Sequence, residues 1–404
     1  MAHGRRVLLG GLAWGGLSAP FLRRASAQNR TLQVWHDLGE NGTKWFAEVA
    51  TAFAAQEAGV LVRAVSYPTD QWFSRSIGAL NTDTGPDLLF NNYERVIRVA
   101  NQTGKIADLR PVLDSVADRG AYLSDDDLRV ANYAGRMVIL PVQRVQMAFG
   151  VRKSWLERAN EPFPATWDDV RRVGAKFQQD GRQFALALQA AKPRDLVHML
   201  DLFTFGAGLQ HTLVDPQGQV VLDEPRHAQV LRDFLSTFAA GSRLVAPDPI
   251  NPSFGEMSQM IEGGRAGMFR VGDWNVAKWD GAATLKGDFA VGPWPAHFAG
   301  TPGKVVVGGM RGVAVPDNGK QVELATRFAA FLMSKPAQQA SLRHVGAAVR
   351  KDLDTDGLSE RQRLFAKPEW PLAALTTYQL LEHPRVVGWA EGFGAGLRCA
   401  AGRG

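Results

Sequence analysis

The sequence of 404 residues lacks the short motifs by which many enzymes and metalloproteins are found. It has a single cysteine, Cys399, so an intrachain disulfide is excluded. Its eight histidines are scattered, without the HExxH or Cys/His spacing of a zinc site. Neither the GxSxG motif of hydrolases nor the GxxxxGKS/T phosphate loop occurs. The residues therefore give no positive evidence for catalysis, for a bound metal or for a cofactor.

Long hydrophobic runs are also missing. After the N-terminus, no apolar stretch is long enough to span a bilayer. The hydrophobic fraction of 45% and the charged fraction of 21% are those of a soluble globular protein. The length predicts two domains rather than one.

The N-terminus has the pattern of an export signal. Gly4 to Leu9 reads GRRVLL, a twin-arginine pattern, and Ala25-Ser26-Ala27 is an A-x-A cleavage site. Residues 1–27 hold four arginines and no acids, so their removal lowers the formal net charge from +6 to +2. That small charge does not favour a nucleic-acid partner. No cysteine lies near the cleavage site, so we expect a soluble periplasmic protein without a lipid anchor.

Three predicted strands near the start of the mature chain alternate with predicted helices. The first two cover residues 31–35 and 60–65, and residues 85–90 are a turn followed by the third, which indicates βαβ units and a mostly parallel sheet. Ligands bind at the carboxyl ends of the strands in such a sheet. The polar and aromatic residues that follow these strands are therefore candidate ligand contacts: Trp35, His36, Asp37, Glu40, Thr69, Asp70, Asn91, Asn92 and Tyr93.

The stretch from Phe254 to Trp274, later in the chain, also predicts a strand that is followed by polar and aromatic residues. Met257, Met260 and Ile261 have helical spacing, and glycines then end the helix. A short apolar run follows and ends at Gly272-Asp273-Trp274, which predicts a buried strand with Asp273 and Trp274 at its carboxyl end. Trp274 either faces a ligand or packs in the core.

This order of helix, glycine stop, buried strand and Gly-x-Trp resembles bacterial extracellular solute-binding proteins of family 1. These are maltose-binding-protein-like components of ABC importers. The same family has counterparts of Gly85-Pro86-Asp87 before a strand, of the helix start at Thr166 to Val170, of the glycine-rich segment Val305 to Pro316 and of the helix pair at 323–339. The resemblance covers nearly all of residues 30–350.

The resemblance implies an α/β fold with two lobes, each a mostly parallel sheet flanked by helices, joined by a hinge of several crossings. The implied division is a signal peptide at 1–27, a first lobe at 28–140 and 296–345, a second lobe at 146–288 and 352–404, and crossings near 141–149, 289–295 and 346–351.

The implied function is capture of a sugar or sugar-like solute in the cleft between the lobes and its delivery to a membrane permease. We expect a monomer that is not an enzyme. Further candidate contacts, placed by the resemblance, are Arg144 at a crossing, Gly309, Met310 and Arg311 on the return passage, and Trp370 in the last segment.

Two alternatives remain. The solute could be a small anion such as a glycerol phosphate ester, with Arg144, Arg194 and Arg311 as a guanidinium fork. The chain could instead be a periplasmic glycan-cleaving enzyme, which requires two carboxyl groups about 5–10 Å apart across a bound sugar. No pair of acids in the sequence has a spacing that suggests this.

Overall fold

The structure is a computed structural model of the chain. It describes residues 30–374 except 117, 119–120, 122–131, 178–182, 190–192, 214, 216–218, 239–241, 243, 246–252, 284 and 368. The expected signal peptide at 1–27 and the segment after residue 374 lie outside the described residues, as do the side chains of Asp70 and Arg194.

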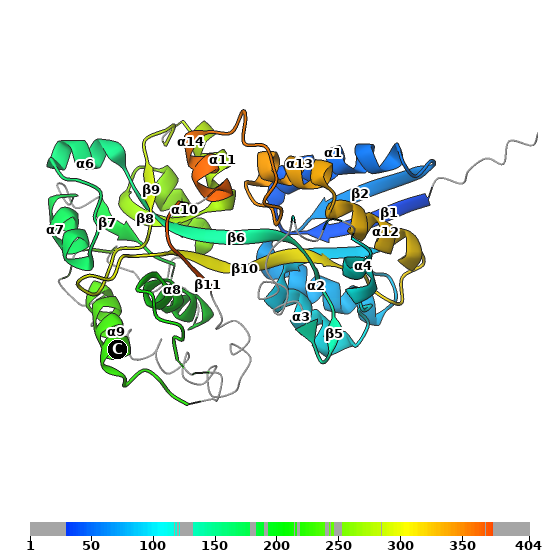
Figure 1. Cartoon of the computed structure of the whole chain (residues 1–404), viewed down its shortest axis with the longest axis horizontal. Helices are drawn as coiled ribbons and strands as arrows, with labels where there is room; N and C mark the ends of the chain where they lie inside the picture. The colour runs from blue at the N-terminus through cyan, green and yellow to red at the C-terminus, as the bar shows by residue number, and fades with distance from the viewer. Residues whose placement is uncertain are drawn as a thin grey trace, which may run out of the picture.

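Two lobes share one sheet, which runs the length of the molecule (Figure 1). The strand order is β2-β1-β3-β10-β6-β8-β7, with β9 paired to β6 and β11 paired to β10. A small separate hairpin consists of β4 (Asn132–Tyr133) and β5 (Arg136–Met137). The two-lobed α/β fold expected from the sequence is confirmed.

The first lobe contains the three strands expected near the start of the chain. These are β1 (Arg30–His36), β2 (Val60–Ser66) and β3 (Leu88–Asn92), and all pair in parallel. Its helices are α1 (Gly39–Ala54), α2 (Thr69–Asn81), α3 (Tyr93–Thr103), α4 (Arg110–Ser115), α12 (Val322–Leu332) and α13 (Lys335–Val345). The apolar stripe of α1, with Trp45 and Phe46, is buried, and the Trp45 Nε1–H donates to the Ala337 carbonyl at 3.1 Å. This bond joins α1 to α13, so parts of the chain that are far apart in sequence pack together in the first lobe.

The second lobe is built around β8 (Ala266–Gly272), which is buried at every position and pairs in parallel with β7 (Phe184–Ala187). Its helices are α6 (Lys153–Ala159), α7 (Trp167–Phe177), α8 (Pro193–Gly206), α9 (Pro225–Phe238), α10 (Phe254–Glu262), α11 (Asp273–Gly281) and α14 (Glu360–Ala366). A capping box between Ser253 and Glu256 starts α10. The helix buries Met257 and Ile261, as its spacing predicts.

Two long strands connect the lobes, β6 (Leu140–Val151) and β10 (Val305–Ala314). One end of β10 pairs antiparallel with β3 of the first lobe, and β6 pairs antiparallel with both β10 and β8. The short strands β9 (Ala290–Gly292) and β11 (Leu372–Ala374) extend this central part. The strands within each lobe therefore pair in parallel, whereas the connecting strands pair antiparallel with each other and with β3, β8 and β9, and only β11 joins β10 in parallel.

Residues 296–304 lie on the second lobe, which differs from their expected place in the first. The Ala296 N–H donates to the Ala165 carbonyl at 2.8 Å, and the Lys304 N–H donates to the Gly206 carbonyl at 2.9 Å. The chain runs toward β3 only along β10, which is later than the expected crossing near 289–295. Near residues 346–351, the Arg144 N–H donates to the Ala348 carbonyl at 3.3 Å, so this segment lies beside β6.

Candidate functional site

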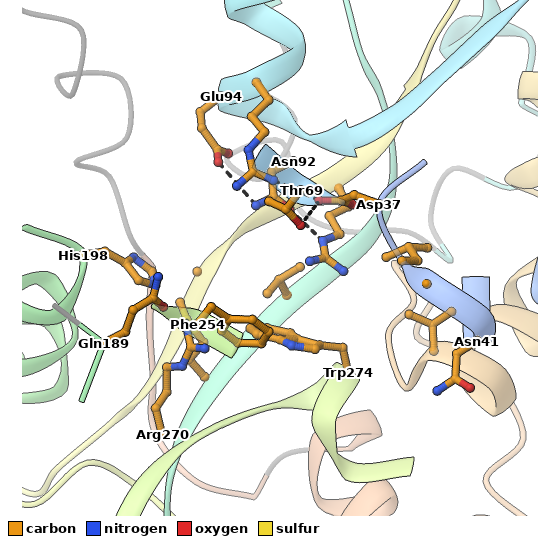
Figure 2. Close-up of a pocket in the computed structure, with 18 of the residues that line it drawn as sticks. Asp37, Asn41, Thr69, Asn92, Glu94, Gln189, His198, Phe254, Arg270 and Trp274 are labelled. Carbon is orange, nitrogen blue, oxygen red and sulfur yellow. Dashed lines mark hydrogen bonds and ion pairs between the residues drawn. The ribbon is translucent and has the colours of Figure 1, made fainter. Parts of the chain in front are cut away.

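A cleft of about 480 Å³ lies between the lobes and is lined by both (Figure 2). The first lobe contributes Asp37, Asn41, Thr69, Asn92, Glu94 and Arg95. The second lobe contributes Gln189, Asp195, His198, Phe254, Arg270, Trp274 and Lys278. The connecting strands form the base with Val145, Met147, Gly308 and Arg311.

Asp37 connects the polar groups on the first-lobe side. Its Oδ2 accepts from Arg95 Nη1 at 3.0 Å and from Thr69 Oγ1 at 3.1 Å. Arg95 Nη1 also donates to Asn91 Oδ1 at 2.9 Å. The Asp37 side chain is only 2% exposed, so this ion pair is held in a poorly solvated position. It fixes the segments that follow β1, β2 and β3 relative to one another.

Arg311 joins the first lobe to the base of the cleft. Its position on β10 is paired in register with Asn92 on β3, and its Nε–H donates to Asn92 Oδ1 at 2.7 Å. Asn92 Nδ2 in turn donates to Glu94 Oε1 at 3.3 Å. The guanidinium carbon of Arg311 lies 5.3 Å from the centre of the Trp274 ring, within cation–π range. The Arg311 guanidinium thus forms no ion pair with a described carboxylate, although its charge acts on the nearby carboxyl of Asp273.

Trp274 packs on the end of its own strand. A Cβ placed on Gly272 would lie 2.3 Å from Cη2 of Trp274, which is too close for any side chain. The glycine of the Gly-x-Trp motif is therefore required by the approach of the indole ring. The Arg270 guanidinium carbon lies 5.4 Å from the Trp274 ring centre and 5.3 Å from that of Phe254, which is 40% exposed. Two aromatic rings and two guanidinium groups thus form the second-lobe side and base of the cleft.

Asp273 is fully buried beneath this surface. Its Oδ2 accepts from the Gln146 N–H and its Oδ1 from the Trp274 N–H, both at 2.8 Å. Burial raises the pKa of its carboxyl to about 7, although these bonds and the nearby Arg311 charge act in the opposite direction. Asp273 therefore fixes α11 to β6 rather than facing the cleft.

Five of the residues predicted as ligand contacts line the cleft: Asp37, Thr69, Asn92, Trp274 and Arg311. Several others are buried and lie outside its lining: His36, Asn91, Tyr93, Asp273 and Met310. Trp35 is part-buried and packs edge-on against Tyr67, with ring centres 5.0 Å apart. Glu40 is on the surface in an ion pair with Lys44 at 2.7 Å. Adjacent strand residues point to opposite faces, which explains why Asn91 and Met310 lie outside the lining while their neighbours Asn92 and Arg311 belong to it.

His36 is buried and supports the loop that follows β1. Its Nδ1 accepts from the Leu38 N–H at 3.2 Å, and its ring packs against Phe46. Burial lowers the pKa of the His36 imidazole to about 4, with the Asp37 charge acting against this. The ring is therefore neutral and holds the loop that carries Asp37.

The remaining predicted contacts lie away from the cleft. Arg144 lines a different cavity, behind β6. Trp370 packs against Phe365 with ring centres 5.8 Å apart. Gly309 has a φ of 102° at the irregular register between β10 and β6, which allows Gly308 rather than Gly309 to line the cleft. Of the alternative fork of Arg144, Arg194 and Arg311, Arg311 lines the cleft and Arg144 lines the other cavity, while the side chain of Arg194 lies outside the described residues.

Several residues that line the cleft were not among the contacts predicted from the sequence. Glu94 and Arg95 come directly after Asn92 and Tyr93, so a longer window after β3 would have included them. Phe254 starts α10, outside the apolar stripe that indicated the helix. Asp195 and His198 are on α8, one turn apart, and Gln189 follows β7. Residues on α8 carry no strand-end signal.

A family model for bacterial extracellular solute-binding proteins matches residues 39–339. The chain belongs to this family. The resemblance predicted from the sequence is thus confirmed, and proteins of this family bind substrates rather than convert them. A search of curated proteins finds no match.

Solved structures of solute-binding proteins share the fold. The GacH receptor of Streptomyces glaucescens has 18% identity and a TM-score of 0.71, with 92% of this chain and 98% of that chain covered. MalE3 of T. maritima has 19% identity and a TM-score of 0.69, with coverages of 92% and 93%. A solute-binding protein of Agrobacterium radiobacter has 19% identity and a TM-score of 0.69, with coverages of 94% and 95%.

In the described part of the chain, no group of three or more His, Cys, Asp or Glu side chains could hold a metal ion. Within the same residues, none of the helices has the length and apolar character needed to cross a membrane.

Proposed function

We propose that this solute-binding protein captures a sugar or sugar-like polyhydroxy solute in the interlobe cleft and delivers it to the permease of an ABC importer. The observation that supports this most directly is the pairing of aromatic rings with hydrogen-bonding groups across the cleft. Trp274 and Phe254 offer apolar faces from one lobe, and Asp37, Asn92 and Glu94 offer polar groups from the other. Sugars have flat C–H faces and a rim of hydroxyls, which match these two kinds of surface.

The solved relatives support the same class of solute. The GacH receptor has been solved with acarbose and an acarbose homologue, MalE3 with maltose and the Agrobacterium radiobacter protein with ribitol. Because these proteins share only 18–19% identity with this chain, we infer its solute from its own cleft.

The proposed mechanism is hinge closure about β6, β10 and residues 346–351. The polar groups and the aromatic rings are on different lobes, so a solute contacts both sets only when the lobes close on it. We propose lobe boundaries that follow the observed contacts, with residues 296–304 in the second lobe and the return crossing at β10. Export by the twin-arginine route, a periplasmic location and a monomeric state complete the proposal.

A second candidate solute carries one acidic group. Arg311 supports it, because within the described residues its only side-chain hydrogen bond goes to the neutral amide of Asn92. A guanidinium in a partly enclosed cleft without a carboxylate partner is suited to an anionic ligand. Arg311→Met would then weaken binding of a sugar acid far more than binding of the matching neutral sugar.

A thermal-shift screen tests the proposal. Neutral sugars, polyols, sugar acids and sugar phosphates are added to the purified protein, since a ligand of the folded state raises the melting temperature by mass action. We expect at least one compound to raise it, and Trp274→Ala to reduce that shift, whereas Trp370→Ala, outside the cleft, leaves it unchanged. No shift with any compound, or release of products from an oligosaccharide, would contradict a binding function.

A further inference from the structure

A second cavity lies behind strand β6, on the other side from the solute cleft. It measures about 320 Å³ and is bordered by β6, by the end of α13 with residues 346–350, and by the end of α14. Side chains along a strand alternate between its faces. Val145 and Met147 accordingly line the solute cleft, whereas Arg144 and Gln146 line this second cavity. We call it the hinge cavity, because β6 and residues 346–350 both run between the lobes there.

Positive charge gathers at the hinge cavity. Four cationic side chains line it, Arg144, Arg350, Lys351 and Lys367, and no acidic side chain is among the described residues that do so. Arg350 is paired, since its Nη2 lies 2.6 Å from Asp118 Oδ2 and its Nε donates to Asp352 Oδ1 at 2.8 Å. The Arg144 guanidinium has no hydrogen bond or ion pair with any described residue, although its Nε is buried. A buried donor on a cation is expected to have a partner.

Gln146 adds a hydrogen-bond acceptor at the same place. The residue is 7% exposed, and its Nε2 donates to the Phe365 carbonyl at 2.7 Å, which fixes the orientation of the amide. Its Oε1 is buried and accepts no hydrogen bond from the described residues. The cavity therefore combines an unpaired guanidinium with an unpaired carbonyl oxygen.

We propose that the hinge cavity binds a small oxyanion that also carries an O–H group, of which monohydrogen phosphate is the simplest. Arg144 donates to the anionic oxygens, Lys351 and Lys367 add positive charge at the rim, and Gln146 Oε1 accepts from the O–H. Helix α13 is on the first lobe and α14 on the second, so the bound anion would contact both sides of the hinge. This site is separate from the solute cleft and does not depend on the identity of the solute.

Titration calorimetry with inorganic phosphate and with sulfate, in a buffer free of both, tests this site. Phosphate should bind, and sulfate should bind at least tenfold more weakly because it carries no proton for Gln146 at pH 7. Arg144→Met should weaken phosphate binding by about tenfold or more, as expected for loss of a charge-assisted hydrogen bond. Arg63→Met removes the same charge from the exposed face of β2 and should have no effect.

Four results would overturn the proposal. Phosphate affinity could be absent, it could persist in Arg144→Met, or it could be lost in Arg311→Met, which would assign the anion to the solute cleft. The fourth is equal affinity for sulfate, because the proposed ligand carries an O–H group that donates to Gln146. Lys367→Met provides a second test if Arg144→Met does not fold, because Lys367 is exposed and its loss should still weaken phosphate binding severalfold.

Discussion

Gly272 and Trp274 are in such close contact that a single added carbon atom at Gly272 would lie 2.3 Å from the indole ring. Gly272→Ala should therefore push the ring away from β8, lower the free energy of unfolding by about 1–3 kcal/mol through overpacking, and weaken solute binding. The measurements are chemical denaturation and calorimetric titration. Gly281→Ala is the control. Gly281 ends α11, the helix that carries Trp274, and a Cβ there meets nothing within 4 Å. Equal effects of the two variants would show that the ring does not depend on Gly272.

Among the acidic residues on the first-lobe side of the cleft, Asp37 should have the largest effect on solute affinity. Asp37→Asn weakens the bonds to Arg95 and Thr69, so the segments after β1, β2 and β3 lose their common link. Solute affinity should fall at least tenfold, with a loss of about 1–3 kcal/mol in the free energy of unfolding. Glu40→Gln, three residues along and on the surface, should change neither, since exposed ion pairs contribute little. An Asp37→Asn protein with unchanged affinity would exclude this cluster from recognition.

The buried carboxyl of Asp273 predicts a specific pH dependence of stability. Its pKa is about 7 in the folded protein, above the ordinary value of 3.8 for this carboxyl group. The folded state therefore binds this proton more tightly than the unfolded state does. The resulting stabilisation is complete below about pH 3.8 and is lost as the pH rises through about 7. Each pKa unit of difference corresponds to about 1.4 kcal/mol.

Asp273→Asn removes this titration. The free energy of unfolding of the native protein, minus that of the variant, should decrease between pH 5 and pH 8. Urea denaturation at several pH values measures both quantities. A difference that stays constant over this range would mean that Asp273 titrates at its ordinary pKa.

Export should depend on the twin-arginine pair in the proposed signal peptide. Replacing Arg5 and Arg6 by lysine keeps the charge but removes the guanidinium pair that the pattern specifies, so the protein should remain in the cytoplasm. Fractionation of cells detects this. The matching replacement of Arg23 and Arg24, next to the cleavage site, should leave export intact. Normal recovery of the first variant from the periplasm would contradict this route.

The sequence was sufficient to predict the edge of the sheet that carries the site. Parallel strands end at one edge, so the residues after β1, β2 and β3 meet there, and Asp37, Thr69 and Asn92 line the cleft as expected. Which of two neighbouring residues faces the cleft depends on the strand's orientation. Asp37 and Asn92 line the cleft, whereas the fully buried His36 and Asn91 do not, and polarity alone does not distinguish them.

For the connecting strands, the side on which each residue lies is also difficult to predict from the sequence. Strand β6 is buried along nearly its whole length, so its sequence shows no alternation of apolar and polar residues. The side of β6 that Arg144 occupies therefore follows only from its pairing with β10 and β8. Contacts from helices, such as Asp195 and His198 on α8, depend on how the lobe packs and leave no local pattern.

Trp274→Ala tests the central claim most directly, with calorimetric titration of the solute found in the screen and chemical denaturation as readouts. Loss of the ring face should weaken binding between severalfold and about a hundredfold, taking about 1–3 kcal/mol for one large apolar contact. Folding stability should change much less than in Trp279→Ala, a buried tryptophan on the same helix, whose truncation should cost about 3–5 kcal/mol. Unchanged solute affinity together with a loss of stability as large as that of Trp279→Ala would show that Trp274 is structural and that the cleft does not bind its solute there.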